Sequence, residues 1–382
     1  MGYLHVEVDA ASSAKKRAAA CGDVWSVERT PEATTVLLSD GLGSGVKAAV
    51  AARMAVSRMT ELLRRGFSIR QAFSRVVHTM HEARGTDLPY AVLSAIRLLN
   101  TGEATVLSYE MPTPLYLTRN AAVPLQMRTI TLDTELVGET GLFLEPGEGI
   151  LLMSDGITQA GIGKTIKLGW ATEGVRRFLD ECRSGGEPME AMARLVHDKA
   201  RQYWEGPFGD DCTALLARMR NGIIVNILTG PPADPRLDGE VAGRFLQMPG
   251  MHVVCGGTTA RIVARRLGRP LDMEPSPQSL IAPPAYRLEG VDLVTEGAVT
   301  LNQVFNILDA DPVDYEPDTG VTQLCRALRS ADRINILVGT ADNAGHADIA
   351  FRQRGIMRRS VIVELLVERL RAAGKLVVPE WI

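Results

Sequence analysis

The chain has 382 residues, of which 46% are hydrophobic, 23% charged and 5% aromatic. This composition is typical of an ordinary folded protein of about two domains and excludes a disordered, fibrous or membrane-embedded chain. The formal net charge of −3 provides no general basic field for phosphate backbones, so we expect no nucleic-acid partner.

The cysteines and the N-terminus indicate the redox state and the cellular location to expect. The five cysteines are far apart and never form a Cys-x-x-Cys pair, which excludes a zinc signature and an evident disulfide framework. The N-terminal basic residues follow the apolar stretch, and no apolar run approaches the ~18 residues that a membrane span needs. We therefore expect a cytoplasmic protein with reduced thiols and no membrane partner.

The first strong pattern is a strand followed by a glycine-rich turn and two helices. Residues 33–39 are β-branched and apolar and lead into DGLGSG at 40–45, which predicts a strand that ends in a tight turn. Residues 47–65 are rich in Ala, Met, Leu and Arg, which predicts a helix. A second helix over 68–84 begins with a capping-box spacing at Ser68 and Gln71.

Antiparallel sheet follows. The segments 90–99 and 105–110 flank the turn NTGE and predict a hairpin. The segment PGEGILLMSDG at 146–156 repeats the arrangement of an apolar strand that leads into Asp-Gly. Two further helices at about 170–183 and 188–204, and a last strand beginning at Cys212, complete a first domain over residues 1–220.

The character of the chain changes near Gly222. Apolar strands that end in Gly or Thr alternate with helical stretches: IIVNILTGPP (223–232), MHVVCGGTTA (251–260), VDLVTEG (291–297) and INILVGTAD (334–342). This alternation predicts a C-terminal α/β domain with a parallel sheet over residues 221–382. A Pro-rich piece at 273–286 is interpreted as an ordered surface loop.

Acidic residues at the ends of strands are the main chemical feature of the first domain. They are Asp23, Asp40, Asp155, Asp210 and Asp211. Hard divalent cations such as Mg²⁺ and Mn²⁺ prefer carboxylate, carbonyl and water oxygens. Glycine at 41 would let its carbonyl approach such an ion without a side chain in the way. Taken singly, each Asp-Gly is equally typical of a simple turn, so only the set favours a metal site.

The order GD, SDGLGSG, helix pair, hairpin, PGEGILLMSDGIT and GDDCTALL resembles the SpoIIE-type branch of the PP2C phosphatases over about residues 1–220. The resemblance implies an α-β-β-α sandwich with two Mn²⁺ or Mg²⁺ ions at one edge. It assigns metal binding to Asp23, Asp40, Asp155, Asp210 and the Gly41 carbonyl, with Asp211 in a neighbouring position. Asp40 and Asp155 are then the residues expected to be essential for catalysis.

The implied activity is hydrolysis of phosphoserine or phosphothreonine by a water bridging the two ions, without a protein nucleophile. The implied substrate is a bacterial regulatory phosphoprotein, such as an anti-sigma-factor antagonist. In related phosphatases the helix pair governs metal binding, so residues 45–84 are expected to regulate activity in signal transduction. The chain departs from the family at Glu110–Pro114, at Glu148 for a common Asp and at Gln159 for a common Glu, which puts the substrate range in question.

Two alternatives remain open. The first domain could be a catalytically inactive PP2C-fold binding protein, although intact Asp40, Asp155 and Asp210 argue against this. The C-terminal domain could instead be catalytic itself on a small phosphorylated ligand, although no motif supports this. In the leading hypothesis it is a sensor or docking module, and the strand-to-helix junction at Gly256–Thr259 is its candidate small-ligand site, although tight packing is the commoner role of such a junction.

The sequence contains three weaker candidates for functional sites. Thr295-Glu296-Gly297 and Thr340-Ala341-Asp342 end strands and are expected at the edge that binds ligands in open α/β sheets. The run Asp342, His346 and Asp348 is more typical of a solvated loop than of a metal site. His78 and His81 are interpreted as helix-surface residues rather than as general acids.

Overall fold

The computed structural model describes residues 2–15, 20–43, 45–85, 88–164, 166–204, 209–273, 286–310, 319–341 and 356–382. The chain divides into two compact units, Met1–Asn221 (unit 1) and Gly222–Ile382 (unit 2). In the ranges just given, no helix has both the length and the apolar character required to cross a membrane.

Unit 1 contains two antiparallel sheets. One has the strand order β1-β11-β10-β6-β7 and the other β2-β3-β4-β5-β9-β8. The first sheet consists of β1 (Leu4–Ser13), β11 (Cys212–Asn221), β10 (Gly149–Met153), β6 (Leu115–Leu117) and β7 (Ala122–Pro124). The second consists of β2 (Asp23–Arg29), β3 (Ala33–Leu42), β4 (Tyr90–Leu99), β5 (Glu103–Tyr109), β9 (Glu135–Phe143) and β8 (Arg128–Leu132). The β4–β5 hairpin is confirmed.

The two sheets pack face to face because their strands alternate apolar side chains toward a shared core. On β3, Val36 and Leu38 belong to the cluster between the sheets, together with Ile150 and Leu215 of the other sheet. Leu37, between them in sequence, points to the opposite face. Since β3 is buried on both faces, its sequence is a continuous apolar run rather than an alternating one.

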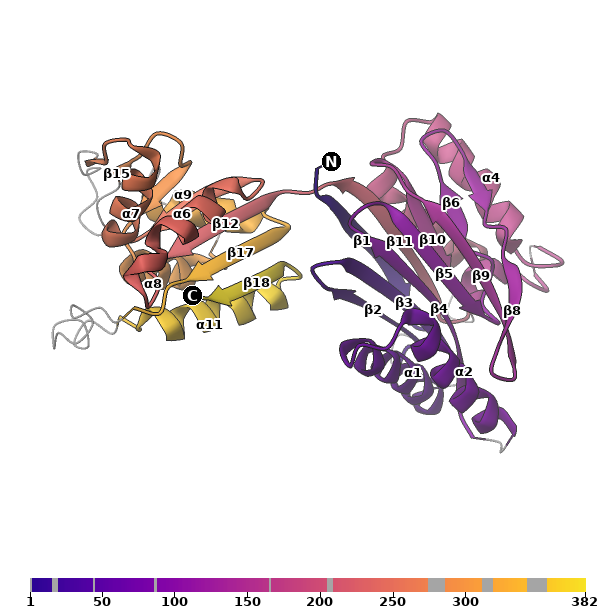
Figure 1. The fold of residues 1–382 in the computed structure, drawn as a ribbon. Helices are drawn as coiled ribbons and strands as arrows, with labels where there is room; N and C mark the ends of the chain where they lie inside the picture. Colours follow the sequence, from indigo (N-terminus) through magenta and orange to yellow (C-terminus); the bar gives the residue numbers. More distant parts are fainter. Residues whose placement is uncertain are drawn as a thin grey trace. The chain divides into compact units, whose positions relative to one another are not determined.

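Helices cover the two outer faces of this sandwich (Figure 1). The helices α1 (Val46–Arg64) and α2 (Ile69–Gly85) pack on the second sheet. The first sheet is covered by α3 (Asp155–Thr158), α4 (Ala171–Ser184), the short η1 (Met189–Ala191) and α5 (Met192–Trp204). The predicted α-β-β-α sandwich is therefore confirmed.

The capping box predicted for the second helix is also present. The Ser68 amide donates to Gln71 Oε1 over 3.0 Å, and the Gln71 amide donates to Ser68 Oγ over 3.3 Å. Reciprocal bonds of this kind satisfy two of the amides that a helix N-terminus leaves without partners.

Unit 2 contains a seven-stranded sheet in the order β14-β15-β16-β13-β12-β17-β18. Its strands are β14 (Asp272–Met273), β15 (Tyr286–Arg287), β16 (Leu293–Thr295), β13 (Met251–Cys255), β12 (Ile224–Thr229), β17 (Arg333–Val338) and β18 (Leu376–Trp381). Five neighbouring strands of this sheet are parallel, as predicted: β16, β13, β12, β17 and β18. The short strands β14 and β15 add an antiparallel pair at one edge.

Helices also lie on both faces of the unit 2 sheet (Figure 1). One face is covered by α6 (Asp238–Gln247), which follows the short η2 (Pro235–Leu237), and by α7 (Gly257–Leu267). The other face is covered by α8 (Ala298–Ile307), α9 (Gly320–Ser330) and α11 (Arg359–Ala372). This is a doubly wound parallel arrangement.

One local expectation needs correction. β3 does not end at the Asp-Gly turn but continues to Leu42, because Gly41 and Leu42 still pair with β4. Asp155-Gly156 follows β10 and forms the first turn of α3. The run Asp342, His346 and Asp348, and most of the Pro-rich piece 273–286, lie outside the described residues.

Candidate functional site

Asp40 and Asp23 are placed by strand alternation at one end of the sandwich. Asp40 lies two and four residues beyond Leu38 and Val36, so it shares their face between the sheets. Asp23 on β2 pairs directly opposite Asp40. Both are nearly buried, with exposed fractions of 6% for Asp23 and 8% for Asp40. The second sheet therefore presents two adjacent carboxylates to the space between the sheets.

The first sheet contributes from the other side. On β11, Leu215 belongs to the core between the sheets, so alternation places Thr213 on the same face, with Asp211 two residues further. Asp155 begins α3 immediately after Ser154, whose side-chain oxygen accepts the Thr213 amide over 2.9 Å. This hydrogen bond fixes the end of β10 to the start of β11. Asp155 follows β10 and Asp211 precedes β11, so both aspartates lie at this end of the sheet.

The carboxylates from the two sheets are close enough to interact. Asp40 and Asp155 share a side-chain hydrogen bond. Burial, with the neighbouring charges of Asp23 and Asp155, raises the pKa of Asp40 to about 9. Burial and the Asp210 charge also raise the pKa of Asp155. Four of the predicted aspartates therefore form one electrostatic cluster.

Asp23 is the most deeply buried member of this cluster. Burial, with contributions from the Asp211 and Asp155 charges, raises its pKa to about 7. Within the described ranges, neither of its carboxylate oxygens has a hydrogen-bond partner at normal distance. A buried carboxylate without a partner is costly, and it is a position that a bound cation would satisfy.

Asp211 is engaged differently. Its Oδ1 accepts the Lys15 amide over 2.6 Å and its Oδ2 accepts the Gly22 amide over 2.8 Å. It therefore ties the chain on both sides of the β1–β2 connection to the start of β11. Its neighbour Asp210 accepts the Asp211 amide and forms an ion pair of 3.5 Å with Lys15 Nζ.

The two Asp-Gly glycines are required by packing rather than by unusual backbone angles. A Cβ atom on Gly41 would lie 2.0 Å from the Ala48 carbonyl oxygen of α1, and one on Gly156 would lie 2.0 Å from the Asp211 carbonyl oxygen. Neither glycine has a positive φ. Gly22 is also required by packing, because a Cβ there would lie 2.8 Å from Asp211 Oδ2.

Three residues that contact the aspartate cluster or its backbone were not identified as site residues from the sequence. Gln159 Nε2 donates to Asp155 Oδ2 over 3.0 Å and so orients that carboxylate. Trp204 Nε1 donates to the Gly156 carbonyl over 2.8 Å. Lys15 lies next to Asp210. The departure at 159 was visible in the sequence, whereas Trp204 and Lys15 carry no spacing signal that identifies them.

The remaining sequence-based candidate residues are not part of the aspartate cluster. His81 Nδ1 is 2.8 Å from Glu135 Oε2, so this polar contact joins α2 to β9. In unit 2, Thr259 Oγ1 accepts the Gly230 amide over 3.0 Å, which fixes the Gly256–Thr259 turn to the end of β12. Glu296 accepts the Tyr286 hydroxyl over 2.9 Å.

The donor set of the cluster fits divalent cations. Asp23, Asp40, Asp155 and Asp210 bring carboxylates from two sheets to the same end of the sandwich, near enough to affect one another's pKa, and the Gly41 carbonyl lies beside Gly22 at this end. Hard cations take oxygen ligands of this kind, and bound charge would relieve the repulsion among them. The unpartnered oxygens of Asp23 point to the same conclusion. The cluster can therefore hold Mg²⁺ or Mn²⁺ and a phosphate group on it.

A family model described as Stage II sporulation protein E (SpoIIE) matches residues 30–220. Among solved structures, the RsbU and RsbW domains of Rv1364c from Mycobacterium tuberculosis are 17% identical, with 64% of this chain and 68% of that chain covered and a TM-score of 0.49. The PP2C phosphatase domain and regulatory fragment of SpoIIE from Bacillus subtilis are 19% identical, with coverages of 58% and 65% and a TM-score of 0.47. No curated protein matches the chain in sequence.

We expect Gly156→Ala to lower the free energy of unfolding of unit 1 by ~1–3 kcal/mol, because its Cβ would overlap the Asp211 backbone. Urea denaturation measures the change. Gly85→Ala is the matched control, since nothing lies within 4 Å of a Cβ there. Equal stability of the two variants would contradict the packing role.

The metal-free protein should lose stability as the pH rises. The pKa of Asp40 is about 9 in the folded state, against ~3.9 in an unfolded chain. The folded state therefore holds a proton that the unfolded state has lost, so this stabilising contribution is complete below about pH 4 and declines toward pH 9. Thermal melting in chelator at pH 6 and pH 9 measures it.

Asp40→Asn is the comparison, because it removes the titrating group. Its melting temperature should fall less between pH 6 and pH 9 than that of the wild type in chelator. Added Mg²⁺ or Mn²⁺ should stabilise the wild type most at the higher pH, where the carboxylates are ionised. Parallel pH profiles for the two proteins would refute the assignment.

Proposed function

The chain belongs to the stage II sporulation protein E (SpoIIE) family, whose PP2C-like domain matches residues 30–220, and from this premise we propose that unit 1 is a metal-dependent protein serine/threonine phosphatase. The observation that supports the proposal most is the convergence of Asp23, Asp40 and Asp155 from two sheets. Its substrate is a phosphorylated regulatory protein of the anti-sigma-factor antagonist kind.

The metal ligands in this proposal are Asp23, Asp40, Asp155, Asp210 and the Gly41 carbonyl. Asp211 acts as a positioning residue, because both of its oxygens accept backbone amides and hold Lys15 and Gly22 against the start of β11. The bound ions would supply an activated water and neutralise charge on the phosphoryl oxygens. No side-chain nucleophile is needed for that chemistry.

The chain's own residues then act through position and charge. Gln159 holds one oxygen of Asp155 and leaves the other free to face the cluster. Lys15, which pairs with Asp210, lies at the rim, where its ammonium group is suited to contact a phosphate oxygen of the substrate. Burial of Asp23 and Asp40 reduces the access of water to the interior side of the site.

Regulation is proposed to act through α1. The backbone of Ala48 lies against Gly41 so closely that any shift of α1 must move the strand that carries Asp40. The outer face of α1 exposes Val46, Val50 and Met54 at helical spacing, with exposed fractions of 71%, 49% and 59%. Unit 2 is proposed to be the sensor or docking module that controls activity.

Purified full-length chain should hydrolyse a phosphothreonine peptide only with Mn²⁺ or Mg²⁺. Asp40→Asn and Asp155→Asn should both fall to the level seen with chelator, because each removes a charged ligand. Release of phosphate measures the rate. Asp198→Asn, an exposed aspartate on α5, is the matched control and should retain activity.

A wild type that binds Mn²⁺ yet releases no phosphate from any phosphopeptide would argue instead for an inactive PP2C-fold binding protein. Activity that survives in both site variants would show that the chemistry lies elsewhere in the chain.

Gln159→Ala should weaken Mn²⁺ binding about 10- to 100-fold, the usual effect of removing a side chain that orients a ligand. Isothermal titration calorimetry measures the affinity, and Gln202→Ala on the exposed side of α5 is the control. Unchanged affinity in Gln159→Ala would mean that the bond to Asp155 has no role in metal binding.

A further inference from the structure

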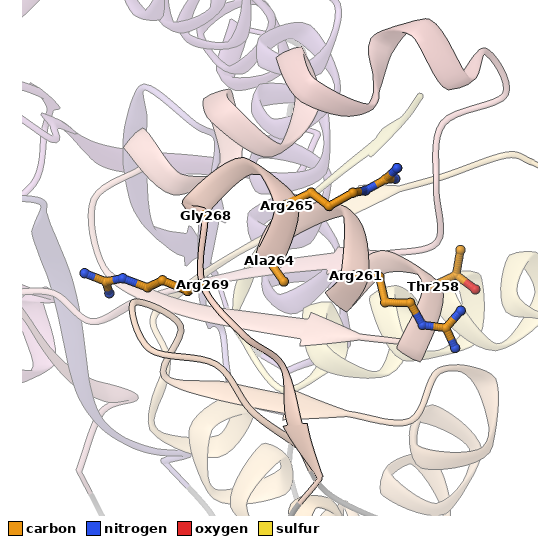
Figure 2. A pocket seen from close by; sticks show the side chains of 6 residues that line it. All are labelled: Thr258, Arg261, Ala264, Arg265, Gly268 and Arg269. Carbon is orange, nitrogen blue, oxygen red and sulfur yellow. The ribbon is translucent and has the colours of Figure 1, made fainter.

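Helix α7 of unit 2 presents a strongly basic outer face. Arg261, Arg265 and Arg269 follow one another at intervals of four residues, and all three are exposed. Together with Thr258, Ala264 and Gly268 they line a surface hollow of about 650 Å³ (Figure 2). We call these six residues the α7 arginine face.

The charge pattern of this helix differs from that of other surface helices in the chain. Between Gly257 and Leu271 there is no acidic residue. On other helices, three arginines have acidic partners four residues away: Arg65 with Glu61, Arg176 with Asp180, and Arg194 with Asp198. Like charges at this spacing destabilise a helix. The α7 arginine face therefore carries a cost that ordinary surface patterning avoids.

The arginines have few partners of their own. Arg265 is 3.5 Å from Asp238 and its side chain is 73% exposed, while Arg269 is 3.4 Å from Glu289. Arg261 makes no ion pair or hydrogen bond with any residue in the described ranges. Exposed pairs at these distances contribute little and exchange readily with another anion. Positive charge thus remains available along the face.

The floor of the hollow is made of small residues. Ala264 lies between Arg261 and Arg265, and Gly268 ends the helix with φ of 66°. Figure 2 shows Arg261 and Arg265 extending to one side of the helix with Thr258, and Arg269 extending to the other. Small residues between long basic ones let the backbone of another chain approach the helix.

We propose that the α7 arginine face is a docking surface for an acidic segment of a protein partner. Arg261 and Arg265 are separated by ~6 Å along the helix axis, and alternate side chains of an extended chain are ~6.6 Å apart. Carboxylates at every second residue therefore match the arginine spacing. Recognition of acidic motifs by arginine clusters uses the same charge-assisted hydrogen bonds.

A protein segment fits this face better than a nucleic acid does. The basic track is short, since Arg261 and Arg265 are only ~6 Å apart along the helix axis and Arg269 lies beyond Gly268, which ends the helix. Acidic Asp238 and Glu289 border it and would repel a longer polyanion. This inference rests on the docking role proposed for unit 2. Binding is measured without hydrolysis, so either proposal can fail while the other stands.

The test is fluorescence anisotropy of full-length chain with a labelled peptide of six Glu-Ser repeats. Arg261→Ala/Arg265→Ala should weaken binding about tenfold, because two charge-assisted contacts are lost. Arg326→Ala is the matched control, since Arg326 is exposed on α9, which covers the opposite face of the sheet. Circular dichroism verifies that each variant is folded.

Binding by wild type and Arg326→Ala that is weakened in the double variant supports the proposal, as does loss of binding in high salt. Absence of peptide binding, or equal binding by all three proteins, overturns it. A single-stranded oligonucleotide of equal charge that binds more tightly than the peptide also overturns it, because the partner would then be a nucleic acid.

Discussion

Mutual repulsion among buried carboxylates is the constraint on which unit 1 depends. Asp23 and Asp40 stand opposite each other on paired strands, and Asp155 bonds to Asp40 from the other sheet. Burial, together with the neighbouring negative charges, raises the pKa values of these groups. Carboxylates perturbed in this way cost stability at neutral pH and are typical of functional sites.

Close backbone packing holds this cluster together. Glycine at 41 lets α1 rest on the strand that carries Asp40, and glycine at 156 lets α3 rest on Asp211. Asp211 in turn fixes the segment before β2, and with it Asp23. Because each contact leaves no room for a Cβ atom, the backbones of the paired elements lie directly against each other.

Much of this arrangement was predictable from the sequence, because apolar strands and capping residues are local signals. The β4–β5 hairpin, the Ser68 cap and the parallel strands of unit 2 follow from such patterns, whereas the sandwich was inferred from the resemblance to the PP2C phosphatases. The engagement of Asp211 by two amides and of Asp155 by Gln159 was not predictable, since it depends on residues brought together by tertiary packing. Glycine at 41 and 156 was correctly singled out, yet the reason is backbone contact rather than turn conformation.

The central claim is that the aspartate cluster is a divalent-cation site. The most direct test is calorimetric titration of the metal-free chain with Mn²⁺. Two buffers of different ionisation enthalpy reveal how many protons are released on binding. The account predicts saturable binding of two ions with release of protons at pH 7, because Asp40 is protonated in the metal-free fold. Absence of saturable binding, or binding without proton release, would contradict it.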